Sequence, residues 1–334
     1  MKREVPEVIY QLEALMRRLD SRNQKLPGID KQINKYWSGY RGEQNLDYYL
    51  DFLPSSKFTC LKTARLKNRL NKTFQLDNLI TTSKFAVLAE VKNNSGTLTF
   101  EPSSAQYFQV INGNRLAISD PFEQVRRQKI EFERWMEDRG IIGYPVLPFV
   151  VIGNQSTILQ FPPGSEAAQH MLFPEQLPKR LETLEKNYQS SNARDFRKQL
   201  GKLHKAIHKE KLPERKDVLN SFKISSSEIQ LGVRCPSCNS YSMLRESGKW
   251  VCPHCQHVSR HAHQLAIMDY FLINKTEIKV KECMDFLQIE SRHLARRILR
   301  GMGCDTKGKG KTTVYLMPPV SVTLSKISDL LNKK

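Results

Sequence analysis

The sequence predicts an α/β protein that carries a small cysteine module and a basic helical domain after its α/β region. Segments of helical and strand-like periodicity alternate over residues 36–155, as expected for a sheet packed against helices. Two Cys-x-x-Cys pairs follow, and three short helical patterns precede a hairpin rich in glycine and lysine. We expect five segments: an amphipathic helical segment at 1–35, the α/β domain at 36–155, a charged helical connector at 156–230, the cysteine module at 231–258 and the basic domain at 259–320.

The spacing of apolar residues predicts the first helices and strands. A helix is expected within 4–20, where four apolar residues recur at helical spacing, and a second helix through 39–53. Strand-like runs follow at 58–63, 73–82, 85–91 and 97–100. Asp120 as N-cap and Pro121 at the first helical position predict a helix that ends near Gly140, and 144–152 is typical of a buried strand.

Composition and charge narrow the classes of function. The chain has 334 residues, of which 39% are hydrophobic and 26% charged, as in ordinary soluble proteins. Its net charge of +19 favours a polyanionic partner, most simply nucleic acid, over a merely basic solvated surface or an anionic membrane. The sequence contains no signal-peptide pattern and no long apolar span, so we expect a cytoplasmic protein with no membrane partner.

Three charged residues interrupt strands that otherwise read as buried. Asp77 lies in one predicted strand, while Glu90 and Lys92 lie two apart in the next and therefore on one face. Two carboxylates suit Mg²⁺ or Mn²⁺, which prefer oxygen ligands, and a lysine beside them can orient a water or offset negative charge. The alternative is an exposed ion pair of Glu90 and Lys92 at a strand end.

Four motifs that follow one another along the chain make this functional interpretation more specific. They are Gly39-x-x-Gly42-Glu43, Gln75-x-Asp77, Glu90-x-Lys92-Asn93 followed by Gly96, and Asp120-Pro121-x-x-Gln124. Together they resemble the nuclease-related domain family, NERD, of the PD-(D/E)xK or restriction-endonuclease-like nucleases. Asp120 stands where asparagine is common in that family, and it can cap the helix equally well.

The resemblance implies a fold and a set of roles. The fold would be a restriction-endonuclease-like mixed sheet flanked by helices. Asp77 and Glu90 would be ligands of the catalytic Mg²⁺ or Mn²⁺, and Lys92 would be the catalytic lysine. Glu43 would be an auxiliary acid that projects from a helix, and Gln124 a supporting polar residue. Without the motifs, Glu43 and Gln124 could equally be solvent-facing side chains.

The cysteine pairs predict a metal site of another kind. Cys235 and Cys238 are separated by thirteen residues from Cys252 and Cys255, and the residues between them read as two short strands around Ser247-Gly248. Two such knuckles complete a tetrahedral Zn²⁺ site with no open position. We therefore expect a zinc ribbon with a structural ion.

The last predicted domain has a basic helix and a basic hairpin. Helices are expected at 261–273, 280–287 and 291–302, followed by a glycine- and lysine-rich turn. This order resembles a winged helix-turn-helix, in which the third helix enters the major groove and the wing touches phosphate. The expected nucleic-acid contacts are Arg292, His293, Arg296, Arg297, Arg300, Lys309 and Lys311. The alternative is a small helical domain for protein contacts.

The sequence thus predicts a metal-dependent nuclease that hydrolyses phosphodiester bonds, with double-stranded DNA as the expected partner. One alternative is a non-catalytic DNA-binding or regulatory protein on a nuclease-like scaffold, and another is an RNA nuclease. The intact set of Asp77, Glu90 and Lys92 favours an enzyme.

Overall fold

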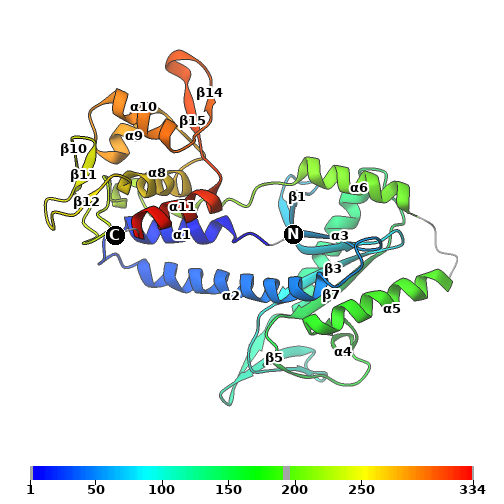
Figure 1. Cartoon of the computed structure of the whole chain (residues 1–334). Helices are drawn as coiled ribbons and strands as arrows, with labels where there is room; N and C mark the ends of the chain where they lie inside the picture. Colours follow the sequence, from blue (N-terminus) through cyan, green and yellow to red (C-terminus); the bar gives the residue numbers. More distant parts are fainter. Residues whose placement is uncertain (1–2, 191–195, 333–334) are drawn as a thin grey trace. The chain divides into compact units, whose positions relative to one another are not determined.

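The computed structural model describes residues 3–190 and 196–332, which form two compact units (Figure 1). One unit contains Arg3 and the described residues of Trp37–Pro213, and the other contains Glu4–Tyr36 and the described residues from Glu214 onward. None of the helices in these described ranges has the length and apolar character needed to cross a bilayer.

A mixed five-stranded sheet organises the first unit. Its order is β1-β2-β3-β7-β9, with the first three strands antiparallel and the last three parallel. The expected mixed sheet flanked by helices is therefore confirmed. The strands are β1 (Thr59–Lys67), β2 (Thr73–Thr81), β3 (Ala86–Lys92), β7 (Val146–Ile152) and β9 (Met171–Leu172).

Helices cover both faces of this sheet because its strands are apolar on both sides. Val87 and Ala89 of β3 pack in one core with α2 (Leu26–Leu50) and α5 (Leu177–Ser190). Ala86 and Leu88 alternate with them and pack in the other core with α3 (Pro121–Glu137) and α6 (Arg197–Glu210). Helices α5 and α6, which were expected within the connector, thus contribute to the cores of this unit.

A second sheet, of order β6-β5-β4-β8, belongs to the same unit. Only its strand at 97–100 was expected from the sequence. Gly96 leads into it with a φ of +75°, and a Cβ there would lie 2.2 Å from the carbonyl oxygen of Val110, so only glycine fits. The strands are β4 (Thr97–Glu101), β5 (Gln106–Ile111), β6 (Asn114–Ile118) and β8 (Ile158–Gln160).

The second unit is built around a buried helix, α8 (Ala262–Ile273), against which α1 (Glu7–Arg18) packs. Arg18 has no exposed surface and pairs with Asp269 of α8 at 2.8 Å. A small sheet, β10-β11-β12, and a sheet of order β13-β15-β14 complete this unit. Their strands are β10 (Leu244–Glu246), β11 (Lys249–Val251), β12 (Val258–Ser259), β13 (Glu277–Ile278), β14 (Thr306–Lys307) and β15 (Val314–Leu316).

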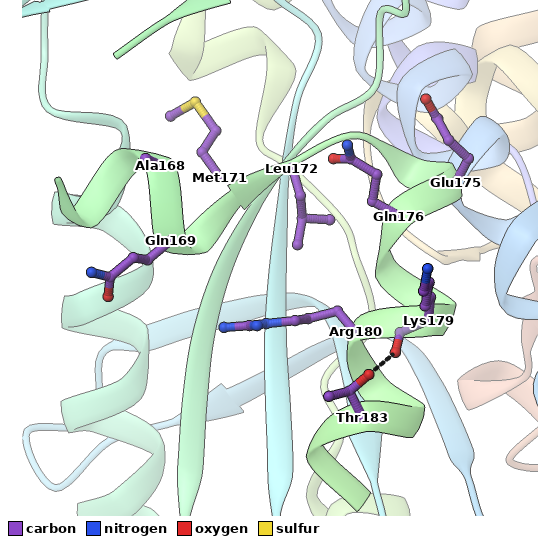
Figure 2. Close-up of a pocket in the computed structure, with 9 residues that line it drawn as sticks. All are labelled: Ala168, Gln169, Met171, Leu172, Glu175, Gln176, Lys179, Arg180 and Thr183. Atoms are coloured by element: carbon purple, nitrogen blue, oxygen red, sulfur yellow. Dashed lines mark hydrogen bonds between the residues drawn. The ribbon is translucent and has the colours of Figure 1, made fainter. Parts of the chain in front are cut away.

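The remaining helices are short, apart from α10 and α11. They are α4 (Glu166–His170), α7 (Val218–Ser221), α9 (Val280–Leu287), α10 (Arg292–Gly301), α11 (Val320–Asn332), and the 3₁₀ turns η1 (Pro174–Gln176), η2 (Ser226–Glu228) and η3 (Gly310–Thr312). A shallow hollow beside β9 and α5 is lined by nine residues, among them Lys179, Arg180 and Thr183 (Figure 2).

Candidate functional site

The end of β3 carries the two charged residues that the sequence singled out. Glu90 and Lys92 alternate with Val91 and therefore continue the face of Ala86 and Leu88, which packs against α3. Glu90 is only 3% exposed. A buried glutamate requires polar partners, because transfer of an unpaired carboxylate from water is strongly unfavourable.

Side chains of β3 and α3 supply those partners. Lys92 Nζ donates to Glu90 Oε1 at 2.8 Å and to Gln124 Oε1 at 2.6 Å. Gln128 Nε2 donates to Glu90 Oε2 at 2.9 Å. Gln124 and Gln128 are four apart and so share one face of α3. The structure thus brings Glu90, Lys92 and Gln124 together, and adds Gln128.

The start of α3 fixes where these glutamines lie. The Asp120 side chain accepts a hydrogen bond from the Phe122 amide at 2.8 Å, and Pro121 occupies the first turn. Asp120 caps the helix as expected. Because Phe122 and Val125 are buried in the core beneath α3, the glutamine face is held toward β3.

Asp77 on β2 completes the pair of carboxylates. Burial raises the pKa of Asp77 well above its usual range, and the negative charges of Glu90 and Glu43 raise this pKa further. A hydrogen bond from Gln75 Nε2 to Asp77 Oδ1, at 3.0 Å, acts in the opposite direction. The negative charges of Asp77 and Glu90 therefore lie close enough to repel each other.

A divalent cation fits this centre because it would offset the negative charges of Asp77 and Glu90. The two nearby donors, Asp77 and Glu90, are carboxylates, the ligands that Mg²⁺ and Mn²⁺ prefer. Among the described residues, no three acidic side chains lie close enough to share one ion; Mg²⁺ commonly uses one or two carboxylates and keeps several waters.

Glu43 reaches this region through a close contact between α2 and the end of β7. A Cβ on Gly153 would lie 2.7 Å from the Cα of Gly42, so both glycines let the helix approach the strand. Asn93 fixes the same contact, since its Nδ2 donates to the carbonyl oxygen of Ser38 at 2.9 Å. The glycine and asparagine of the motifs therefore place Glu43.

Sequence reasoning missed a buried arginine beside Glu43. Arg3 is 7% exposed, pairs with Glu43, and donates to Asp47 at 2.9 Å. Burial alone would lower the pKa of Arg3, but its hydrogen bond with Asp47 and the surrounding negative charges, that of Asp77 among them, outweigh burial and raise it. Arg3 lies far from the motifs in sequence, so no local pattern indicates its role.

The four cysteines of the two pairs form a compact cluster. Their sulfur atoms lie within 4.8 Å of one another, with Cys235–Cys255 at 3.6 Å and Cys238–Cys252 at 3.5 Å. A tetrahedral zinc site with bonds of about 2.3 Å requires sulfurs about 3.8 Å apart. The cluster can hold a zinc ion as the spacing predicts, and it is the only group of three or more potential metal ligands among the described residues.

Both cysteine pairs adopt the same local turn. The Cys235 carbonyl accepts from the Asn239 amide at 3.0 Å, and the Cys252 carbonyl accepts from the Gln256 amide at 2.9 Å. Asn239 and Gln256 both have left-handed backbones, at φ of 66° and 58°. Between them, β10 and β11 form a hairpin whose turn is Ser247-Gly248, as expected for a small zinc ribbon.

The predicted basic side chains lie on the solvent side of α10. Ser291 caps this helix by accepting from the Leu294 amide at 3.2 Å, while Ala295, Ile298 and Leu299 are buried. The exposed residues are Arg292, His293, Arg296, Arg297 and Arg300, together with Lys309 between β14 and β15. The side chain of Lys311 lies outside the part of the chain that the structure describes.

Arg245 of β10 lies near the same basic side chains, although it was not among the nucleic-acid contacts expected from the sequence. Burial and then the positive charge of Arg297 lower the pKa of Arg245. Its Nε and Nη1 atoms are buried without a hydrogen-bond partner among the described residues, and its guanidinium lies 5.2 Å from the ring centre of Trp250.

Comparison with known families agrees with the geometry. Residues 38–153 match the family model NERD, the nuclease-related domain. The chain therefore contains a nuclease-related domain, and the match covers Glu43, Asp77, Glu90, Lys92 and Gln124 but neither Arg3 nor the second unit. No curated protein and no solved structure matched the chain.

Proposed function

We propose that this protein is a metal-dependent nuclease that hydrolyses phosphodiester bonds in DNA. One observation carries the proposal: Asp77 and Glu90 lie together at the end of the sheet, with Lys92 fixed beside them, inside a nuclease-related domain. The nuclease-related domain supports nuclease-like chemistry, and the adjacent carboxylates of Asp77 and Glu90 support a divalent cation, Mg²⁺ or Mn²⁺, between them.

Each residue of the centre has a distinct part in this mechanism. When bound by Asp77 and Glu90, the divalent ion supplies a bound water of lowered pKa and stabilises charge on the phosphate. Lys92 is held by Glu90 and Gln124, so its ammonium group is directed without a further conformational change. It would orient the attacking water or offset the charge that develops on the phosphate. Gln128 keeps Glu90 in place.

The second unit would supply affinity for DNA. Three helices, α8, α9 and α10, and a three-stranded sheet follow the order of a winged helix-turn-helix, which supports placing α10 in the major groove and Lys309 on phosphate. Arg297, which is exposed on α10 and whose charge acts on Arg245, would contact another phosphate. Zinc at the four cysteines would fix β10, which carries Arg245.

Cleavage of labelled plasmid and linear duplex DNA tests the proposal. The full chain, folded and zinc-loaded, should cut both substrates or one of them only when Mg²⁺ or Mn²⁺ is added. Glu90→Ala and Lys92→Ala should each reduce the rate about 100-fold or more, whereas Glu101→Ala, which removes a half-exposed acid from β4, should not.

The same assay separates the alternatives. Structured RNA as substrate and competitor distinguishes an RNA nuclease, which would cut the RNA faster than the duplex. Tight binding of DNA without cleavage in any divalent ion would instead support a regulatory DNA-binding protein on a nuclease-like scaffold.

A further inference from the structure

Arg3 is a buried cation beside the acidic centre that the proposed mechanism does not use. It lies outside residues 38–153, yet it belongs to the same compact unit as the centre. Its guanidinium donates to Asp47 at 2.9 and 3.1 Å, to Asn78 Oδ1 at 2.6 Å and to Thr63 Oγ1 at 3.0 Å, and it pairs with Glu43. These partners come from α2, β1 and β2.

The contacts divide the carboxylates of this region into two groups. Glu43 and Asp47 on α2 are paired with Arg3, and Asp47 also pairs with Lys62 at 3.1 Å. Glu90 is paired with Lys92. Among the described residues, Asp77 alone in this set forms no ion pair, and its side chain accepts a hydrogen bond from Gln75 instead.

We propose that Arg3 is a positioning residue and resident cation of the acidic centre, which neutralises Glu43 and thereby limits the centre to one divalent ion, held by Asp77 and Glu90. This inference rests on the proposed nuclease function. In sites with two metal ions, the ions lie about 3.5–4 Å apart and need shared or additional carboxylates. Here Arg3 binds the additional carboxylate, Glu43, so a second ion would have to displace a guanidinium.

Arginine suits this role better than lysine. Its planar group has five donors and stays charged at all physiological pH values, so one side chain can bind Glu43, Asp47, Asn78 and Thr63 together. Lysine would keep the charge but could not hold all four partners. The two substitutions Arg3→Lys and Arg3→Gln therefore separate the charge of Arg3 from its positioning of Glu43.

Titration of the zinc-loaded full chain with Mn²⁺ tests the inference, with calorimetry for affinity and electron paramagnetic resonance of free Mn²⁺ for stoichiometry. The wild type should bind one Mn²⁺ that Glu90→Gln abolishes. Arg3→Gln should bind a second Mn²⁺, or the first about tenfold more tightly, because the negative charge of Glu43 is then no longer offset by the guanidinium. Arg3→Lys should retain one ion, and Arg69→Gln, which removes an exposed arginine of the same unit, should behave as wild type.

Cleavage adds a second readout. Arg3→Gln and Arg3→Lys should both cut DNA more slowly at saturating Mn²⁺, by about tenfold or more, because neither holds Glu43 in place. A loss of cleavage that accompanies tighter or additional metal binding in Arg3→Gln, and unchanged binding in Arg3→Lys, distinguishes positioning from a general loss of folded protein.

Three results overturn the inference, and one of them also overturns the proposed function. If Arg3→Gln binds one Mn²⁺ with wild-type affinity, Arg3 does not limit the centre, although the nuclease proposal stands. If Arg3→Gln does not fold, the Mn²⁺ stoichiometry of Arg3→Lys tests the inference instead. This variant keeps the positive charge, so binding of a second Mn²⁺ would contradict the claim that this charge limits the centre to one ion. If the wild type binds no Mn²⁺ that depends on Glu90, the metal-dependent function fails together with the inference.

Discussion

Asp77 is the carboxyl group of the centre whose protonated form is favoured by its surroundings in the fold. Burial and the charges of Glu90 and Glu43 raise its pKa, and its one hydrogen-bond donor among the described residues, Gln75, does not compensate. A carboxylate whose pKa is higher in the folded than in the unfolded state binds its proton more tightly when folded. Stability then falls as the pH rises from the unfolded pKa through the folded one.

Asp77→Asn should therefore stabilise the protein in the absence of added divalent ions. As the pH rises above the usual pKa of aspartate, the folded wild type loses stability that the amide does not lose, and each unit of raised pKa corresponds to about 1.4 kcal/mol. We expect a higher melting temperature for the variant at pH 8, a smaller difference at pH 4, and no cleavage. Added Mn²⁺ should stabilise the wild type and leave Asp77→Asn unchanged; equal stabilisation of both proteins would exclude Asp77 as a ligand.

A second prediction for a single residue concerns Gln128, which orients Glu90. It is buried and donates to Glu90, so Gln128→Ala would leave one carboxylate oxygen without its partner. We expect metal affinity and the cleavage rate to fall about 10- to 100-fold, as for other residues that orient metal ligands. Lys129→Ala, at the neighbouring half-exposed position on α3, is the control and should have little effect.

At the scale of the elements, the close contact between α2 and the end of β7 requires glycine at positions 42 and 153. Gly153→Ala would place a Cβ 2.7 Å from Gly42, so α2 must move away from β7, and Glu43 with it. We expect a loss of about 1–3 kcal/mol in the free energy of unfolding, and slower cleavage. Chemical denaturation measures the first and the plasmid assay the second.

Gly39→Ala provides the matched control for that contact. A Cβ at Gly39 meets nothing within 4 Å, and alanine is the better helix former, so α2 should gain about 0.5–1 kcal/mol. If Gly153→Ala proved as harmless as Gly39→Ala, the close approach of α2 would not be what places Glu43.

Several elements were predictable because local chemistry decides them. Asp120-Pro121 starts α3, Ser291 starts α10, and the apolar run of β3 is buried as its composition predicts. The hairpin of β5 and β6 was missed, although Asn112-Gly113 is the strongest local signal for such a turn and both residues have positive φ. A periodicity search favours long apolar runs, whereas β6 is almost entirely exposed.

The candidate site was predictable to the extent that its residues lie in short motifs. Asp77, Glu90, Lys92 and Gln124 lie close together, as those motifs imply. Gln128 could have been found from its spacing of four residues from Gln124. Arg3 could not have been found from a local pattern, because its partners Glu43, Asp47 and Asn78 lie 40 to 75 positions from it in the chain.

At the scale of the whole molecule, a net charge of +19 predicts that DNA affinity falls steeply with salt. Arg296→Ala should weaken binding and reduce the slope of log affinity against log salt by about 1 if Arg296 contacts one phosphate. Arg22→Ala, which removes another exposed arginine of the second unit, should leave the slope nearly unchanged. Fluorescence anisotropy with labelled duplex measures both; equal slopes in all three proteins would remove α10 from the interface.

The central claim is that Lys92 acts in the chemical step at a metal centre formed by Asp77 and Glu90. Single-turnover cleavage of a labelled duplex, with the protein in excess and the DNA fully bound, tests it most directly because binding no longer limits the rate. We predict rapid cleavage by the wild type in Mg²⁺ or Mn²⁺, and cleavage about 100-fold slower by a folded Lys92→Ala protein that binds the duplex equally well. Equal rates for the two proteins, or bound DNA that stays intact with the wild type in both ions, would contradict the claim.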